Sequence, residues 1–226
     1  MNKYYINITN HCNRRCPFCC MYSSPENNIF MDFEDFHDVL YDLTGDANTI
    51  VQLEGGEPTL HPQFALFLEY ACSLKAVERV VIDTNGSTID DVLPVITSAA
   101  ARNKKMVEVK ISLNDFLLRS DVHLSEIIRD VYFSTEFLDY VKVSANVRGY
   151  TEEEAQRMAD LLGDNIPKSV HILNDYGRAA GKGLPKLQIA KVYDEWACIA
   201  TDGTDFGTDL EARSEYEYKL SNNKKQ

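Results

Sequence analysis

Apolar side chains recur along the chain with two alternating periods, one typical of strands and one typical of helices. Tyr4–Thr9 is β-prone and alternates, which predicts a strand, whereas Phe30–Leu43 repeats its apolar side chains at helical spacing. The same succession continues as far as Leu173. The further predicted strands are Thr49–Leu53, Arg79–Ile82, Met106–Leu113, Tyr140–Val147 and Lys168–Leu173. The further predicted helices are Pro62–Leu74, Thr88–Arg102, Leu124–Phe137 and Thr151–Leu162.

This order of elements predicts an α/β fold. Six strands that alternate with helices require a parallel sheet, because right-handed crossovers join the successive strands. Loops at the carboxyl ends of parallel strands carry the functional site in such folds. The segments that fall there are a cysteine-rich loop after the first strand, Gly55-Gly56-Glu57, Thr84-Asn85-Gly86 and Asn114.

The chain changes character after the sixth predicted strand. Residues 176–183 are rich in glycine, and a short β-prone stretch, Gln188–Tyr193, and a turn-like segment, 202–205, follow. The last six residues are polar, and we expect them to fray. We therefore predict a core over 1–180 and a carboxyl-terminal extension over 181–226, which covers the core or binds a substrate or a partner.

Composition and charge narrow the class of protein. At 226 residues, with 44% hydrophobic and 26% charged residues, the chain has the size and make-up of one globular domain. The net charge of −12 disfavours binding to nucleic acid or to anionic lipid, because both need a basic surface. No run approaches the ~20 apolar residues that cross a bilayer, and the polar start does not resemble a signal peptide. We expect a cytoplasmic protein.

The cysteines indicate a metal site. Cys12, Cys16 and Cys19 form a C-x3-C-x2-C motif. Three thiolates on one short loop can hold three irons of a four-iron cluster and leave the fourth iron open, which favours chemistry over structural support. The alternative is structural zinc, with His11 or Cys20 as a fourth ligand. Zinc sites of that kind use two separated cysteine pairs, and this chain has one compact group.

The cysteine motif, followed by Gly-Gly-Glu-Pro after the next predicted strand, resembles the radical S-adenosylmethionine (radical SAM) enzymes over about residues 1–180. The resemblance implies a (β/α)6 partial TIM barrel and a [4Fe–4S] cluster on Cys12, Cys16 and Cys19. It also implies that the open iron chelates S-adenosylmethionine, and that one electron cleaves the sulfonium bond. The resulting 5′-deoxyadenosyl radical would abstract hydrogen from a substrate. An external one-electron reductant such as flavodoxin or ferredoxin is implied as a partner.

The resemblance also implies a binding segment for the cofactor. Gly55, Gly56 and Glu57 match the family segment that hydrogen-bonds the methionine amino group, and Pro58 stiffens its exit. The competing interpretation is an ordinary strand-to-helix turn, in which the glycines serve conformation only. Phe18 matches an aromatic position that shelters the cluster and the nearby adenine.

Further candidate cofactor-binding residues lie near the ends of later strands. Ser112 and Asn114 resemble family positions that contact the ribose or the carboxylate of S-adenosylmethionine, although such residues also form simple turns. Asn85 lines the mouth of the site by position, or forms an Asx turn. Asn146 is expected to face into the barrel, where a cofactor or substrate would supply its partners. Arg178, within Gly-Arg-Ala, resembles a recurring segment of peptide-modifying and related family members and is a candidate for binding a carboxylate.

The chain departs from many relatives in one respect. Cys198 is the only cysteine after Cys72, and one thiol cannot anchor the auxiliary clusters that many relatives carry. We expect a small peptide or a small polar metabolite as substrate. One alternative is an activase that installs a glycyl radical on a partner protein, although those relatives usually lack this Gly-Gly-Glu-Pro form. Another is a noncatalytic zinc- or iron-binding interaction module.

Overall fold

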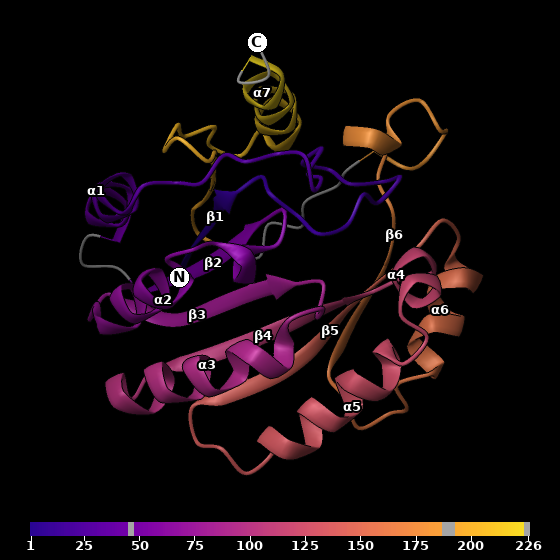
Figure 1. Ribbon diagram of the computed structural model, residues 1–226, viewed down its shortest axis with the longest axis horizontal. Helices are drawn as coiled ribbons and strands as arrows, with labels where there is room; N and C mark the ends of the chain where they lie inside the picture. The colour runs from indigo at the N-terminus through magenta and orange to yellow at the C-terminus, as the bar shows by residue number, and fades with distance from the viewer. Residues whose placement is uncertain (45–47, 187–192, 224–226) are drawn as a thin grey trace.

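The computed structural model describes residues 1–44, 48–186 and 193–223. Within them the strands form one parallel sheet in the order β6-β5-β4-β3-β2-β1-β7, curved into a partial barrel (Figure 1). The strands are β1 (Asn2–Thr9), β2 (Thr49–Gly55), β3 (Val77–Thr84), β4 (Met106–Leu113), β5 (Val141–Gly149), β6 (Lys168–Ile172) and β7 (Trp196–Ile199). The helices are α1 (Phe33–Thr44), α2 (Phe64–Ser73), α3 (Ile89–Asn103), α4 (Asp115–Ser120), α5 (Leu124–Thr135), α6 (Glu152–Asp160) and α7 (Leu210–Asn223), with 3-10 turns η1 (Pro58–Leu60) and η2 (Gly177–Ala179).

The predicted α/β class and the parallel order of the first six strands are confirmed. β1 to β6 lie side by side in chain order, as a (β/α)6 partial barrel requires. The sheet has one strand more than predicted, because β7 from the extension pairs with β1 in parallel. Trp196–Ile199 is only four residues long, which is too short for its periodicity to predict a strand. The division of the chain at residue 180 stays a prediction.

The two faces of the sheet differ in polarity. The apolar face packs against the helices and forms the core together with Phe36 and Phe67. The next residue of each strand lies on the opposite, concave face, because side chains alternate along a strand. One buried row across the apolar face is Ile6, Leu53, Ile82, Val109 and Val143. The following residues, on the concave face, are Asn7, Glu54, Asp83, Lys110 and Ser144.

The start of one helix differs from the prediction, and the predicted amino-terminal cap of another is confirmed. α1 begins at Phe33 and not at Phe30, because Phe30 pairs with Thr9 in an isolated antiparallel bridge. The predicted cap of α6 is confirmed: the Thr151 hydroxyl accepts from the Glu154 amide at 3.1 Å.

The extension contains an unpredicted helix, α7, which Figure 1 shows near the β1 end of the sheet. Its buried residues are polar, so the hydrophobic pattern does not reveal it. They are Arg213, Ser214, Glu217 and Ser221. α7 continues to Asn223, which includes the first three of the residues expected to fray; 224–226 lie outside the described residues. Residues 187–192, most of the predicted stretch Gln188–Tyr193, also lie outside them. No helix in the described part of the chain combines the length and the apolarity that a bilayer crossing needs.

Candidate active site

The three motif cysteines lie on the loop that leaves the carboxyl end of β1. All three are free thiols; Cys12 is buried, and Cys16 and Cys19 are half-buried. The Cys12 sulfur accepts from the Arg14 amide at 3.4 Å and from the Asn85 side-chain nitrogen at 3.7 Å. Hydrogen bonds to sulfur stabilise thiolate ligands of iron–sulfur clusters, so these donors fit a cluster held by this loop.

The environment of Cys12 and Cys16 favours the protonated thiol in the absence of metal. Burial raises the pKa of Cys12 to about 12. Burial and the neighbouring thiols raise the pKa of Cys16 to about 12, against the opposing charges of Arg178 and Arg14. A metal that binds here must therefore displace protons. Across residues 1–44, 48–186 and 193–223, no three Cys, His, Asp or Glu side chains converge on a single-ion site.

The two glycines of the Gly-Gly-Glu-Pro segment are needed for a close approach between loops. A Cβ on Gly55, whose φ is +149°, would lie 2.2 Å from the Thr9 carbonyl oxygen. A Cβ on Gly56 would lie 2.1 Å from the carbonyl oxygen of His11. The Gly56 and Glu57 amides donate to these same oxygens at 2.7 and 2.8 Å. The loop after β2 is thus fastened to the start of the cysteine loop, and its contact with a cofactor stays a prediction.

The Glu57 side chain joins the loop after β2 to the turn after β3. It is 0% exposed, and its carboxylate accepts from the hydroxyls of Thr59 at 2.6 Å and Thr84 at 2.7 Å. The Asn85 amide donates to its other oxygen at 2.7 Å. Burial raises the pKa of Glu57, and these hydrogen bonds oppose the shift. Pro58, also buried, begins η1. Glu57 therefore holds Asn85 in place beside Cys12.

Arg178 holds the far side of the cysteine loop. Its guanidinium donates to the carbonyl oxygens of Cys16 at 3.1 Å, Tyr22 at 2.6 Å and Ser23 at 2.7 Å. Its amide donates to the Cys19 carbonyl at 3.0 Å. These contacts give Arg178 a positioning role, and its contact with a carboxylate of a ligand stays a prediction.

The other predicted residues are divided between the rim and the concave face. The Phe18 ring lies edge-on to Tyr150 and Phe116, at 5.9 and 6.3 Å between centroids, and so links the cysteine loop to the loop after β5 and to α4. The Asn114 side chain accepts from the Leu117 amide at 2.9 Å and caps α4, which is the turn-forming role considered from the sequence.

Ser112 and Asn146 lie in register with each other on the concave face. The Ser112 hydroxyl is 3.5 Å from Asp83, and the Asn146 side chain accepts from the Ser169 hydroxyl at 3.4 Å. The structure thus brings Ser112 and Asn146 together inside the barrel, whereas Asn85, Arg178 and the Gly-Gly-Glu-Pro segment gather around the cysteine loop.

Sequence reasoning missed a buried ion pair that closes one side of the barrel. Arg213 of α7 donates to the Glu54 carboxylate at 2.6 Å and to the Tyr5 carbonyl at 3.0 Å. Ser214, next to it, donates to the carbonyl of Cys20. No motif marks Arg213, because its importance depends on where α7 docks.

Asp83 is a second missed residue, and its burial predicts a pH effect on stability. Burial, reinforced by Glu54, raises the pKa of its carboxyl group to about 6. The unfolded chain loses this proton near pH 4, so the stabilising contribution is complete below about pH 4 and is lost as pH rises through 6. Between pH 4 and pH 8, we expect Asp83→Asn to gain about 3 kcal/mol in free energy of unfolding relative to the wild type. Urea unfolding across this range measures the difference, and parallel pH profiles would contradict the prediction.

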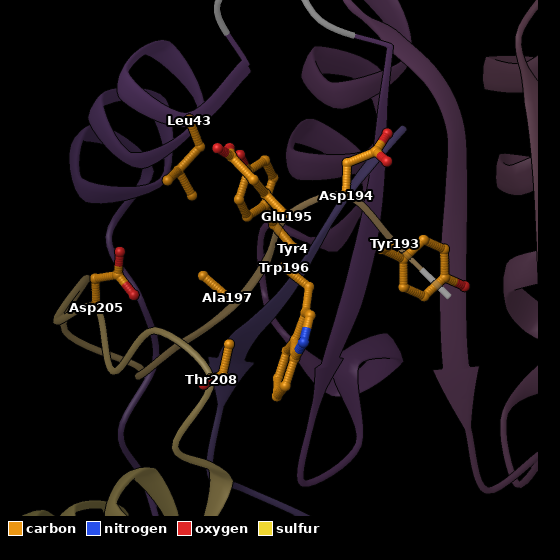
Figure 2. A pocket seen from close by; sticks show the side chains of 9 residues that line it. All are labelled: Tyr4, Leu43, Tyr193, Asp194, Glu195, Trp196, Ala197, Asp205 and Thr208. Atoms are coloured by element: carbon orange, nitrogen blue, oxygen red, sulfur yellow. The ribbon is translucent and has the colours of Figure 1, made fainter. Parts of the chain in front are cut away.

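A cavity of about 570 Å³ lies apart from the cysteine loop, beside the amino-terminal part of β1 (Figure 2). It has three aromatic rings and three carboxylates in its wall, and none of its lining residues belongs to the predicted site. The lining residues are Tyr4, Leu43, Tyr193, Asp194, Glu195, Trp196, Ala197, Asp205 and Thr208.

The fold and the site define a partial-barrel protein with a three-cysteine loop at the carboxyl ends of its strands. The sequence model of the radical SAM superfamily matches residues 6–174. The chain therefore belongs to the radical SAM superfamily, and the prediction of an enzyme family of this kind is confirmed.

The individual proteins that this chain resembles share less than a third of their aligned residues with it. A GTP 3′,8-cyclase of Chlorobaculum tepidum is 29% identical over 94 residues, which are 42% of this chain and 28% of the cyclase. The antilisterial bacteriocin subtilosin biosynthesis protein AlbA of Bacillus subtilis is 25% identical over 183 residues, 76% of this chain and 39% of AlbA. The crystal structure of Streptococcus suis SuiB bound to S-adenosylmethionine aligns with a TM-score of 0.56 at 17% identity, covering 82% of this chain and 43% of SuiB. The chain thus spans less than half the length of each of these proteins, and the SuiB likeness shows the fold.

Proposed function

We propose that Cys12, Cys16 and Cys19 hold a [4Fe–4S] cluster, and that the chain uses it with S-adenosylmethionine to start radical chemistry on a substrate bound in the barrel. The observation that carries the proposal is the cysteine loop itself: three free thiols with amide donors to the Cys12 sulfur, next to the Gly-Gly-Glu-Pro turn. When bound, the two cofactors supply a hydrogen-abstracting radical. An external one-electron reductant supplies the electron.

The residues of the chain position these groups and exclude water. Arg178 and Glu57 hold the loops on either side of the cysteines, and the Phe18 ring closes the rim toward Tyr150. Asn85 lies beside the Cys12 sulfur, and the Gly55-Gly56 turn packs against the start of the cysteine loop. We infer that the methionine part of S-adenosylmethionine binds next to these residues. The polar concave face is left to orient the substrate.

The proposed substrate is a small peptide or a small polar metabolite. AlbA is named for bacteriocin biosynthesis, and SuiB has been crystallised with the precursor peptide SuiA. The match to AlbA extends over 76% of this chain, compared with 42% for the match to the GTP 3′,8-cyclase of C. tepidum. The longer match favours the peptide.

The test is analysis of anaerobically reconstituted protein. We expect about four iron and four sulfide ions per chain, and release of 5′-deoxyadenosine when a reductant and S-adenosylmethionine are added. Stoichiometric zinc in place of iron, or an iron-loaded protein that never forms 5′-deoxyadenosine, would overturn the proposal.

Glu57→Ala tests the link between the loops. The change leaves several buried donors, including the Thr84 hydroxyl and the Asn85 amide, without an acceptor, so we expect a loss of about 3 kcal/mol in free energy of unfolding. Affinity for S-adenosylmethionine should fall about tenfold while iron content stays at the wild-type level. Urea unfolding and equilibrium binding measure the two effects.

Glu108→Ala is the matched control. It removes a carboxylate of the concave face, which is paired with Arg79 at 3.1 Å toward the amino-terminal side of the sheet. We expect it to lower stability and leave the affinity for S-adenosylmethionine unchanged. Unchanged affinity in Glu57→Ala as well would limit that residue to a role in the fold.

A further inference from the structure

The concave face of the barrel carries more cations than its carboxylates neutralise. Two of its carboxylates already have partners: Glu54 pairs with Arg213 at 2.6 Å, and Glu108 with Arg79 at 3.1 Å. Glu108 also accepts from the Ser144 hydroxyl at 2.7 Å. These pairs remove Glu54 and Glu108 as counter-ions for the remaining cations of the face.

Lys110 and Arg148 are two of the remaining cations. Lys110, on β4, lies in register with Asp83 and Ser144, and Arg148, on β5, lies in register with His171. Both cations are half-buried. Among the described residues, no carboxylate lies within ion-pair distance of either side chain.

The two cations are on neighbouring strands of the same concave face, and both influence the same two titratable groups. Both lower the pKa of His171, after the larger effect of burial. Both also oppose the rise in the pKa of Asp83 that burial causes. Asp83 is therefore a counter-charge that the two cations share, and one carboxyl group cannot neutralise both. Lys3 adds a third positive charge near Lys110, since Lys110 contributes to lowering the pKa of Lys3 to about 8, after burial.

A half-buried cation without a partner loses hydration and gains little in return. The cost is notable in a chain of net charge −12, which has an excess of carboxylates elsewhere. A bound anion would offset this loss of hydration energy, because guanidinium and ammonium groups form charge-assisted hydrogen bonds with carboxylates and phosphates.

We propose that Lys110 and Arg148 form the subsite that binds an anionic group of the substrate, a carboxylate or a phosphate. This inference rests on the proposed function only in taking the barrel as the substrate site. A peptide substrate would present an acidic side chain or its terminal carboxylate to the two cations. A metabolite would present a carboxylate or a phosphate.

The test measures binding without turnover. Anaerobically reconstituted protein, saturated with S-adenosylmethionine, is titrated calorimetrically with inorganic triphosphate in one arm and with a tetraglutamate peptide in the other. We expect at least one probe to bind, and its affinity to fall about tenfold or more in Lys110→Gln and in Arg148→Gln. The probe that binds identifies the anion as phosphate or carboxylate.

Two kinds of control variant accompany the test. Lys142→Gln removes an exposed cation from the same face of β5 and should keep wild-type affinity for the probe. Lys110→Arg and Arg148→Lys keep the charge and should retain most of the binding, which separates loss of the cation from loss of the fold. A circular-dichroism melt of each variant confirms that it is folded.

Three results would overturn the inference. In the first, neither probe binds. In the second, the wild type and both glutamine variants bind the probe with equal affinity. In the third, those variants lose affinity for S-adenosylmethionine itself about tenfold. The last would assign the cations to the cofactor carboxylate. Because the readout needs no radical, a protein that binds the probe through Lys110 and Arg148 but forms no 5′-deoxyadenosine would refute the proposed function and leave this subsite intact.

Discussion

Cys16→Ala is expected to abolish both the iron content and the release of 5′-deoxyadenosine, the largest change for any single substitution considered. A site-differentiated cluster has three protein ligands, and removing one leaves an iron without its thiolate. Cys16 lies between the other two cysteines of the loop, and its carbonyl accepts from both the Cys19 amide and Arg178. Iron and sulfide analysis, visible absorbance and chromatography of 5′-deoxyadenosine measure the loss.

Cys20→Ala is the matched control for this experiment. Cys20 is adjacent to Cys19 and is also a free thiol, but it lies outside the three-cysteine motif. We expect the variant to bind about four iron ions and to form 5′-deoxyadenosine like the wild type. Persistent 5′-deoxyadenosine in Cys16→Ala, or loss of iron in Cys20→Ala only, would refute the ligand assignment.

Gly177→Ala is expected to have the second largest effect, because the added methyl group would meet backbone of the cysteine loop. Gly177 has a φ of +62°, and a Cβ there would lie 2.5 Å from the Cys20 Cα and 2.6 Å from the Cys19 carbonyl oxygen. Backbone atoms cannot yield as a flexible side chain does. We expect a loss of about 3 kcal/mol in free energy of unfolding and a clear fall in iron content, since the loop must shift.

Gly181→Ala separates this clash from backbone strain. Gly181 has a similar φ of +75°, but a Cβ there would meet nothing within 4 Å. Only the left-handed conformation opposes alanine at this position, so we expect a cost of about 1 kcal/mol and normal iron content. Similar losses of stability and iron in the two variants would show that the contact between Gly177 and the loop is unimportant.

These experiments address one feature of the molecule: the cysteine loop is held by segments from distant parts of the chain. The Gly55-Gly56 turn holds its start, and Gly177 and Arg178 hold its middle. α7 adds contacts from the extension, from Ser221 to Asn10 and from Ser214 to Cys20. A flexible loop that carried three thiols would lose conformational entropy each time it bound a metal, and this loss would weaken binding. Because these contacts order the loop when the protein folds, the entropy is lost before the metal binds.

Part of the candidate site was predictable because its signal is local. The cysteine spacing and the Gly-Gly-Glu-Pro segment are each read within a few residues, and strand ends place them at one edge of the sheet. The roles of Glu57 and Arg178 were not predictable in the same way. Each uses its polar atoms on backbone or side chains that are far away in sequence, such as Asn85 and Tyr22.

The sequence by itself determined the succession of strands and helices, the parallel sheet and the place of the cysteine motif, because periodicity and spacing act over short stretches of chain. Only the tertiary structure decided that β7 extends the sheet beyond β1, that α7 docks through a polar face, and that Lys110 and Arg148 remain without carboxylate partners in the described part of the chain. The physical reason is that pairing of charges and burial of polar groups depend on which distant segments meet, and no local pattern records that.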